Sequence, residues 1–230
     1  MLVAIHQPNF FPWMGYFDKI RRADVFIFLD AVDYPRAGSG GMGSWCNRVQ
    51  VNIQEEARWV TCPLKRATLG TPINAIAIDD GQPWRAKLLR TLDANYRKAA
   101  HYHHAMALLE PLIVSPNNNL ATFNIAAIQA IAHYLGMETR FVRQSSLSGE
   151  GRATDLLISL VRAVDGQAYL AGGGAGGYQQ DEAFAAARMD LVYQGFEPRS
   201  YGKETKFIAG LSIIDYLMHD GRPLDAFMES

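Results

Sequence analysis

Residues 2–30 read LVAIHQPNFFPWMGYFDKIRRADVFIFLD, and this stretch decides the fold. Its first four residues are an apolar run that is too short for a helix and suits a buried strand. The polar turn His6-Gln7-Pro8-Asn9 follows, and a helical pattern then leads into a second apolar run at residues 25–29. The pattern predicts a strand–loop–helix–strand unit. Ligands of open α/β sheets bind beyond the carboxyl ends of such strands, which is where the polar turn lies.

The rest of the chain alternates between strand and helix patterns. Period-two alternation and turn residues indicate strands at residues 48–53, 58–63, 73–78, 138–143, 168–171 and 191–193. Apolar spacing near 3.6 indicates helices at residues 84–101, 104–114, 120–135, 153–164, 181–187 and 212–220. We therefore predict a single domain over residues 1–230, an α/β fold with a mostly parallel central sheet of Rossmann-like layered type and a helical segment at about residues 82–136.

Composition narrows the function classes. The net charge of −1 gives no electrostatic case for binding nucleic acid. No apolar stretch is long enough for membrane insertion and no basic segment opens a signal peptide, so a cytoplasmic location is expected. Cys46 and Cys62 suggest neither a disulfide nor a metal site. The cluster His101, His103 and His104 has little beyond Glu110 nearby to complete a metal site, so no metal is predicted, and the cofactor is unknown.

His6 is the leading catalytic candidate, because an imidazole can transfer protons near neutral pH. The alternative is a buried histidine that hydrogen-bonds to the next loop. The amides of Gln7 and Asn9 could orient a substrate or polarise a carbonyl. Asp30 ends the neighbouring strand and is the second catalytic candidate, as a group that orients His6 or binds a metal, although a turn or surface role is an equal alternative.

Two further segments suggest ligand binding. Arg48 could hold a carboxylate or phosphate bidentately, beside Trp45 and Asn47. A glycine-rich loop at residues 172–178 follows a strand, and its backbone amides could approach an anion, although a plain surface loop is the alternative. The segment SGGMGS at residues 39–44 is typical of a loop that orders over a ligand.

The chain resembles the WbqC-like protein family. The motif HQPNFFPWMGYFDKI at residues 6–20, followed by ADVFIFLD, carries the resemblance, and LSIIDYLMHDG at residues 211–221 is similar to the family's terminal helix motif. The SGGMGS segment departs from the family, whose members often have a shorter connection there, and residues 203–206 differ from its usual Tyr-x-Gln pattern.

The resemblance implies a role in O-antigen or other surface-polysaccharide biosynthesis. It implies a transferase that adds an acyl or aminoacyl group to a nucleotide-linked or lipid-linked sugar, with a sugar nucleotide or activated acyl donor as its small-molecule partner. Oligomeric state stays open, and a homodimer is one option. The residues predicted to bind substrate, from the residue types or the resemblance, are Gln7, Asn9, Trp13, Tyr16, Lys19, Trp45, Asn47, Arg48, Gly172, Gly173, Gly174 and Tyr178.

Two other functions stay open. A strand, a loop with histidine, a helix and a strand also open nucleotidyltransferases, but the second histidine of their H-x-G-H motif is missing here. A non-catalytic scaffold or binding protein of the same pathway is the other alternative, with Phe10, Phe11 and Trp13 as exposed aromatic side chains that dock a partner.

Overall fold

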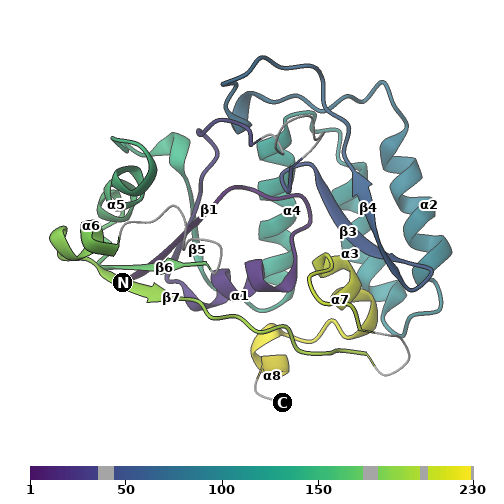
Figure 1. Ribbon diagram of the computed structural model, residues 1–230. Coiled ribbons are helices and arrows are strands. Elements are labelled where there is room, and N and C mark those ends of the chain that lie inside the picture. The colour runs from purple at the N-terminus through teal and green to yellow at the C-terminus, as the bar shows by residue number, and fades with distance from the viewer. Residues whose placement is uncertain (36–43, 173–180, 203–206, 229–230) are drawn as a thin grey trace. The chain divides into compact units, whose positions relative to one another are not determined.

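The structure is a computed structural model that describes residues 1–35, 44–172, 181–202 and 207–228 (Figure 1). The chain packs as two compact units. The first unit comprises Met1–Gln7, Gly15–Ala31 and Met137–Glu197. The second comprises Pro8–Met14, Val32–Gly136 and Pro198–Ser230. The division falls within the polar turn at residues 6–9, so His6 and Gln7 belong to the first unit and Pro8 and Asn9 belong to the second.

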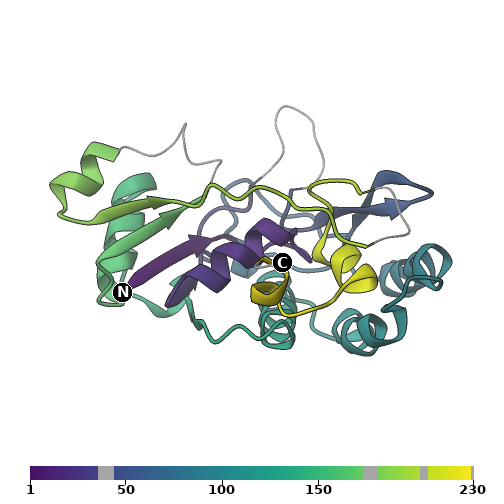
Figure 2. The same cartoon turned by 90° about the horizontal axis from the view of Figure 1, so that it is seen from below.

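The first unit is built on a five-stranded sheet in which every pairing is parallel, so the predicted α/β fold with a parallel central sheet is confirmed. The strand order is β5-β2-β1-β6-β7, with β1 at the centre. Strand β6 lies between β1 and β7, and the strands of this sheet can be followed in both ribbon views (Figures 1 and 2). The strand bounds are β1 Leu2–His6, β2 Val25–Phe28, β5 Arg140–Arg143, β6 Ala168–Ala171 and β7 Asp190–Tyr193.

Helices cover both faces of this sheet, which explains why its central strands are apolar throughout. Helices α5 (Ala153–Ala163) and α6 (Asp181–Ala186) pack on the face that carries Val3 and Ile5. On the alternate face, Tyr16 of α1 (Met14–Arg22) contacts Phe26 at 5.3 Å between ring centroids. Because side chains alternate along a strand, the run at residues 25–28 supplies both layers at once.

The second unit combines an antiparallel hairpin with helices. The turn residues Gln54 and Glu55 have φ of 53° and 63°, the left-handed geometry that a tight hairpin needs. Asn119 caps α4, its side chain accepting the Thr122 amide, and Gly136 follows that helix at φ 79°. The elements of this unit are β3 Arg48–Ile53, β4 Glu56–Thr61, α2 Trp84–Tyr96, α3 Tyr102–Val114, α4 Leu120–Tyr134, α7 Ile213–His219 and α8 Leu224–Met228.

The strand predicted at residues 73–78 is wrong. Ile73–Ala75 forms a 3-10 turn, in which the Ile76 amide donates to the Ile73 carbonyl. The apolar residues Ile73 and Ile76 are three apart, so this turn buries both, and only isolated bridges at Ala77 and Ile78 follow. Helix α8 was not predicted from the sequence, because its five residues are too few to show a period.

Helix α7 begins against the loop that follows the polar turn. The Ser212 hydroxyl donates to the Phe11 carbonyl at 2.6 Å, and the Ile213 amide donates to the Pro12 carbonyl at 2.8 Å. These bonds hold Phe11 at φ 38°, a conformation that a bulky residue rarely adopts. Ser212 also caps α7, its side-chain oxygen accepting the Ile214 amide. The Asp215 side chain, however, does not complete an S-x-x-D capping box, because it accepts the hydroxyls of Tyr96 and Tyr201 instead.

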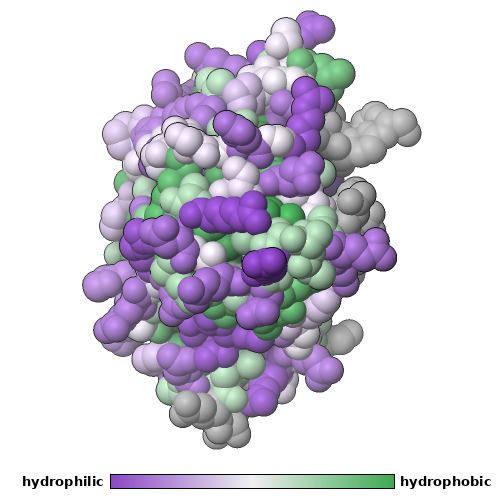
Figure 3. Space-filling view, turned by 90° about the vertical axis from the view of Figure 1, so that its left-hand side faces the viewer, coloured by the Kyte–Doolittle hydropathy of each residue, from purple (hydrophilic) through white to green (hydrophobic). Residues whose placement is uncertain are grey.

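No helix within the described ranges is both long and apolar enough to span a bilayer. The face shown in Figure 3, on the side of α5 and α6, is mostly hydrophilic, with apolar groups showing between polar ones.

Candidate functional site

His6 is the last residue of β1, and its ring is fixed by its own turn. Its Nδ1 lies 3.1 Å from the Gln7 carbonyl oxygen, and its ring meets that of Tyr16 edge-on at 4.8 Å. A carbonyl only accepts, so Nδ1 carries the proton and the neutral ring keeps its lone pair on Nε2. Burial, aided by the nearby charge of Lys19, lowers the pKa of His6 to about 4, although the Gln7 contact opposes this. His6 is therefore neutral at physiological pH.

Lys19 projects from α1 to the same end of β1. Its Nζ donates to the Ile5 carbonyl at 2.8 Å and lies 5.5 Å from the centre of the Tyr169 ring. Lys19 is 3% exposed, and no carboxylate of the described residues forms an ion pair with it. Burial lowers the pKa of Lys19 to about 7, so part of the amine is unprotonated at neutral pH. A buried lysine without a fixed anion is a common feature of binding and catalytic sites.

The glycine-rich loop begins beside Lys19. A Cβ placed on Gly172 would lie 4.0 Å from Lys19 Nζ and 4.0 Å from Gln194 Oε1, so both polar groups border this backbone. The Gln194 amide nitrogen donates to the Gly15 carbonyl and to Asp18, which orients its oxygen. The first residue of the loop, Gly172, therefore lies next to the Lys19 amine. The other predicted loop residues, Gly173, Gly174 and Tyr178, lie outside the described residues.

Asp30 has a different environment from the one expected. Its two carboxylate oxygens accept the Ser145 amide at 2.9 Å and the Ser145 hydroxyl at 2.7 Å. Asp30 thereby links the end of β2 to the segment after β5. The groups that contact the His6 ring are the Gln7 carbonyl and the Tyr16 ring. A catalytic role for Asp30 stays a prediction.

In the second unit, Asn9 and Asn47 are buried in the framework. The Asn47 amide nitrogen donates to the Cys62 carbonyl, and its oxygen accepts the Tyr34 hydroxyl and the Ser44 amide. Asn9 Oδ1 lies 3.7 Å from the Cys46 thiol. Asn47 therefore joins the turn before the hairpin to the end of β4, a structural role beside the predicted contact with substrate.

Arg48, Trp45 and Trp59 form a surface cluster. The Arg48 guanidinium lies 4.5 Å from the Trp59 ring centre, and the Trp45 and Trp59 rings are 5.2 Å apart. The two tryptophans are 49% and 43% exposed. Exposed indole faces beside a cation suit a flat, partly apolar ligand with an anionic group. The sequence analysis did not predict Trp59 as a site residue, because its pattern is that of an ordinary β-strand. A tryptophan among the polar residues of that strand could have indicated an exposed binding surface.

The expected aromatic docking surface is wrong for two of its three residues. Phe10 is 1% exposed and Phe11 is fully buried, because both pack against Phe123 of α4. Trp13 is partly buried and forms an isolated bridge with Ser212. Without exposed rings at residues 10 and 11, the scaffold hypothesis loses the observation on which it rested.

Asn124 is a buried polar residue that the sequence analysis did not single out. Its side-chain amide donates to the carbonyls of Pro8 and Cys46 at 2.8 and 2.7 Å, which fastens the polar turn to the segment before the hairpin. The sequence feature that could have identified Asn124 is its position as an asparagine within the apolar face of α4.

The structure brings together His6, Gln7, Tyr16, Lys19 and Gly172 in the first unit. Arg48 lies in the second unit, so the expectation that it shares one pocket with His6 and the glycine-rich loop stays a prediction. Across the described ranges, no three His, Cys, Asp or Glu side chains are placed to hold a metal ion. The two cysteines are buried free thiols, and burial raises the pKa of each to about 12.

Comparison with known proteins gives the family but not the reaction. The model of the WbqC-like protein family matches residues 7–224. The chain is also 28% identical over 232 residues to a protein of Mycobacterium tuberculosis (strain ATCC 25618 / H37Rv) described as "Uncharacterized protein Rv1507c", covering 94% of this chain and 97% of that protein. No solved structure matches the chain. With a family match across nearly its whole length, the chain belongs to the WbqC-like protein family.

Proposed function

We propose that this protein is a transferase that moves an acyl or aminoacyl group onto a nucleotide-linked or lipid-linked sugar in surface-polysaccharide biosynthesis. The observation that carries the proposal is the pairing, at the carboxyl end of β1, of a neutral histidine with a buried lysine that forms no ion pair with a carboxylate of the described residues. Family membership supports the pathway, because the resemblance of the chain implies polysaccharide chemistry.

In this proposal His6 carries the proton of the acceptor. The amine or hydroxyl of the sugar attacks the acyl carbon of the donor, and its proton moves to His6 Nε2. The bond between the acyl carbon and the leaving group breaks, and the leaving group departs with the electron pair and receives the proton from His6. A histidine with a low pKa returns a proton readily, which suits this second transfer.

Lys19 holds the anionic part of the donor or acceptor. A phosphate or carboxylate beside Nζ would favour the charged amine and raise its lowered pKa. Gly172 presents backbone without a side chain beside that amine, which leaves room for the anion.

The exposed tryptophans of the second unit provide a surface for a sugar ring. In the proposal a ring stacks on Trp45 or Trp59, and Arg48 contacts a phosphate. The same cluster favours a second candidate, a carbohydrate-binding protein without turnover, because stacking on tryptophan needs no catalytic group.

Incubation of the protein with nucleotide-linked amino sugars and activated acyl donors, followed by mass spectrometry, tests the proposal. We expect a product heavier than the sugar by one acyl group, and its loss in His6→Ala. A full rate with His6→Ala would refute the mechanism. Binding without any product across the donor panel would favour the carbohydrate-binding candidate, and release of pyrophosphate from a nucleoside triphosphate would indicate nucleotidyl transfer.

A further inference from the structure

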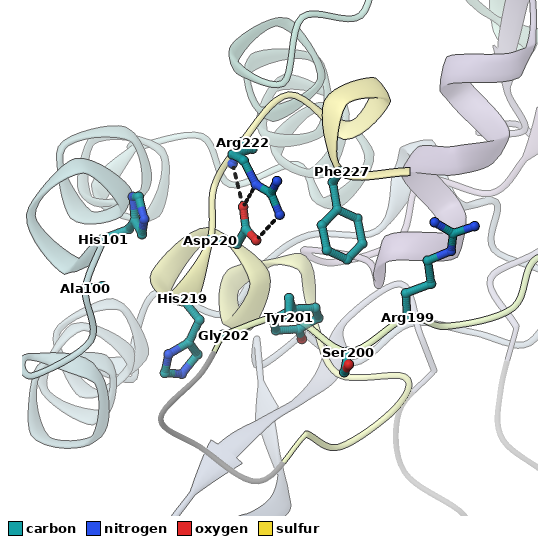
Figure 4. A pocket seen from close by; sticks show the side chains of 10 residues that line it. All are labelled: Ala100, His101, Arg199, Ser200, Tyr201, Gly202, His219, Asp220, Arg222 and Phe227. Carbon is teal, nitrogen blue, oxygen red and sulfur yellow. Dashed lines mark hydrogen bonds and ion pairs between the residues drawn. The ribbon is translucent and has the colours of Figure 1, made fainter. Parts of the chain in front are cut away.

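A cavity lies within the second unit, and its lining includes none of the residues grouped around His6. Its volume is about 850 Å³, which is enough for a ligand of nucleotide size. Much of its wall comes from the LSIIDYLMHDG motif and the residues that follow it (Figure 4). His219 and Asp220 end that motif's helix, and His101 faces them from the start of α3.

The charged side chains of the cavity leave donors for an anion. Arg222 Nε and Nη2 donate to the two Asp220 oxygens at 2.7 and 2.9 Å, which fixes the guanidinium, and Nη1 donates to no residue of the described ranges. Arg199 donates through Nη1 to the Met228 carbonyl at 2.7 Å, and its other nitrogens form no hydrogen bond with the described residues. Two arginines against one aspartate give the wall a formal charge of +1 with the histidines neutral. Held guanidinium groups suit phosphate.

An aromatic wall stands beside these charges. Phe227 lies under the Arg222 guanidinium, 5.5 Å from it, and Tyr201 is 6.4 Å from Phe227 between ring centroids. The Tyr201 hydroxyl donates to the buried Asp215 carboxylate at 2.9 Å, which fixes the ring in place. Gly202, at φ 74°, lets the backbone pass close to His219, since an added Cβ would lie 3.1 Å from that side chain. The cavity thus joins fixed cations to a rigid ring surface.

We propose that this cavity binds a sugar phosphate, free or within a nucleotide, with the phosphate on Arg199 and Arg222 and the ring against Phe227 and Tyr201. The inference does not rest on the transferase reaction, because none of these residues belongs to the site around His6.

Isothermal titration calorimetry of the full chain tests this site, with glucose 1-phosphate, uridine diphosphate, inorganic phosphate and glucose as probes. We expect at least one of the two ring-bearing phosphates to bind, inorganic phosphate to bind more weakly, and glucose to give no signal. Binding of uridine diphosphate alone would identify the nucleotide as the source of the phosphate, and binding of glucose 1-phosphate alone would identify the free sugar phosphate.

Variants then locate the site. Arg199→Gln should weaken binding about tenfold or more, since a charge-assisted hydrogen bond is lost. Arg222→Gln combined with Asp220→Asn should do the same without leaving a lone carboxylate, and Phe227→Leu should reduce affinity for the ring-bearing probes only. Arg66→Gln, at an exposed position outside the cavity, is the matched control.

Arg199 is exposed, so its substitution should leave the melting temperature unchanged. Failure of both ring-bearing phosphates to bind at millimolar concentration would overturn the proposal. Affinity that falls with Lys19→Met and not with Arg199→Gln would also overturn it, because the ligand would then lie in the first unit.

Discussion

The end of β1 in the first unit and the start of β3 in the second unit use their polar residues in opposite ways. The side chain of Asn47, directly before β3, makes three hydrogen bonds with neighbouring groups. Lys19 has three donors, of which the described residues accept one, at the Ile5 carbonyl. The bond on His6 is at Nδ1, which leaves Nε2 its lone pair. A buried polar group that bonds to groups of the fold stabilises it, whereas one that leaves most of its bonds unmade is placed to meet a ligand.

The largest effect expected is on the rate of the proposed reaction. His6→Ala should lower it by about 10²–10⁴-fold, because a proton-transfer group is lost. The melting temperature, measured alongside, separates a loss of chemistry from a loss of folding, since the His6 ring also packs on Tyr16. Turnover measured by mass spectrometry checks this, with His104→Ala, an exposed histidine of α3, as the control. An equal loss of rate in His6→Ala and His104→Ala would show that the effect is not specific to the end of β1.

The opposite result is expected for Asn47→Ala. It leaves the Cys62 carbonyl and the Ser44 amide without their partner, so we expect a loss of about 3 kcal/mol in the free energy of unfolding. Urea denaturation measures it, and Asn95→Ala, at an exposed position on α2, should cost little. A stability equal to that of the wild type would show that Asn47 does not hold the fold.

Lys19→Met should stabilise the protein, by about 2 kcal/mol at pH 6, because it removes a buried charge. The folded pKa of about 7 lies below the unfolded value of 10.5, so the unfolded chain binds more protons between these values and wild-type stability rises with pH there. The advantage of the variant should therefore shrink from pH 7 to pH 9. Urea denaturation across this range checks the trend, and an advantage that grows with pH would contradict it.

The smallest effect is expected at the exposed tryptophans. Trp45→Ala should weaken binding of a sugar nucleotide by about fivefold, because one stacking surface is lost, and leave stability nearly unchanged. Fluorescence titration measures the affinity, and Trp84→Phe, a buried change, is the comparison. An unaltered affinity would exclude this surface from substrate binding.

The sequence predicted elements whose signals are local. Period and turn residues were enough for the β1–α1–β2 unit and for the two neighbouring strands β3 and β4. These local patterns were not enough where contacts between residues distant in the sequence determine what a side chain binds. The Asp215 side chain accepts from Tyr96, which is 119 residues away, and so it leaves the capping role that its spacing indicated.

The same limit applies to the site. The motif identified His6 and Lys19. The environment of each, however, depends on contacts with residues that are distant in the sequence, and the spacing within the motif does not indicate them. Lys19 is surrounded by β1, Tyr169 and the start of the glycine-rich loop, and these contacts lower its pKa. The phenylalanines at residues 10 and 11 show the reverse error, since a polar turn beside them suggested exposure and α4 buries them.

The central claim is that His6 stays neutral with its lone pair on Nε2, and ¹⁵N-detected NMR titration of the imidazole measures this directly. Burial and Lys19 lower the pKa of His6, so we expect a midpoint of about 4 and the Nδ1–H form from pH 5.5 upward. His104→Gln and His6→Gln assign the signals. A midpoint near 6.5, or the Nε2–H form at neutral pH, would contradict the account.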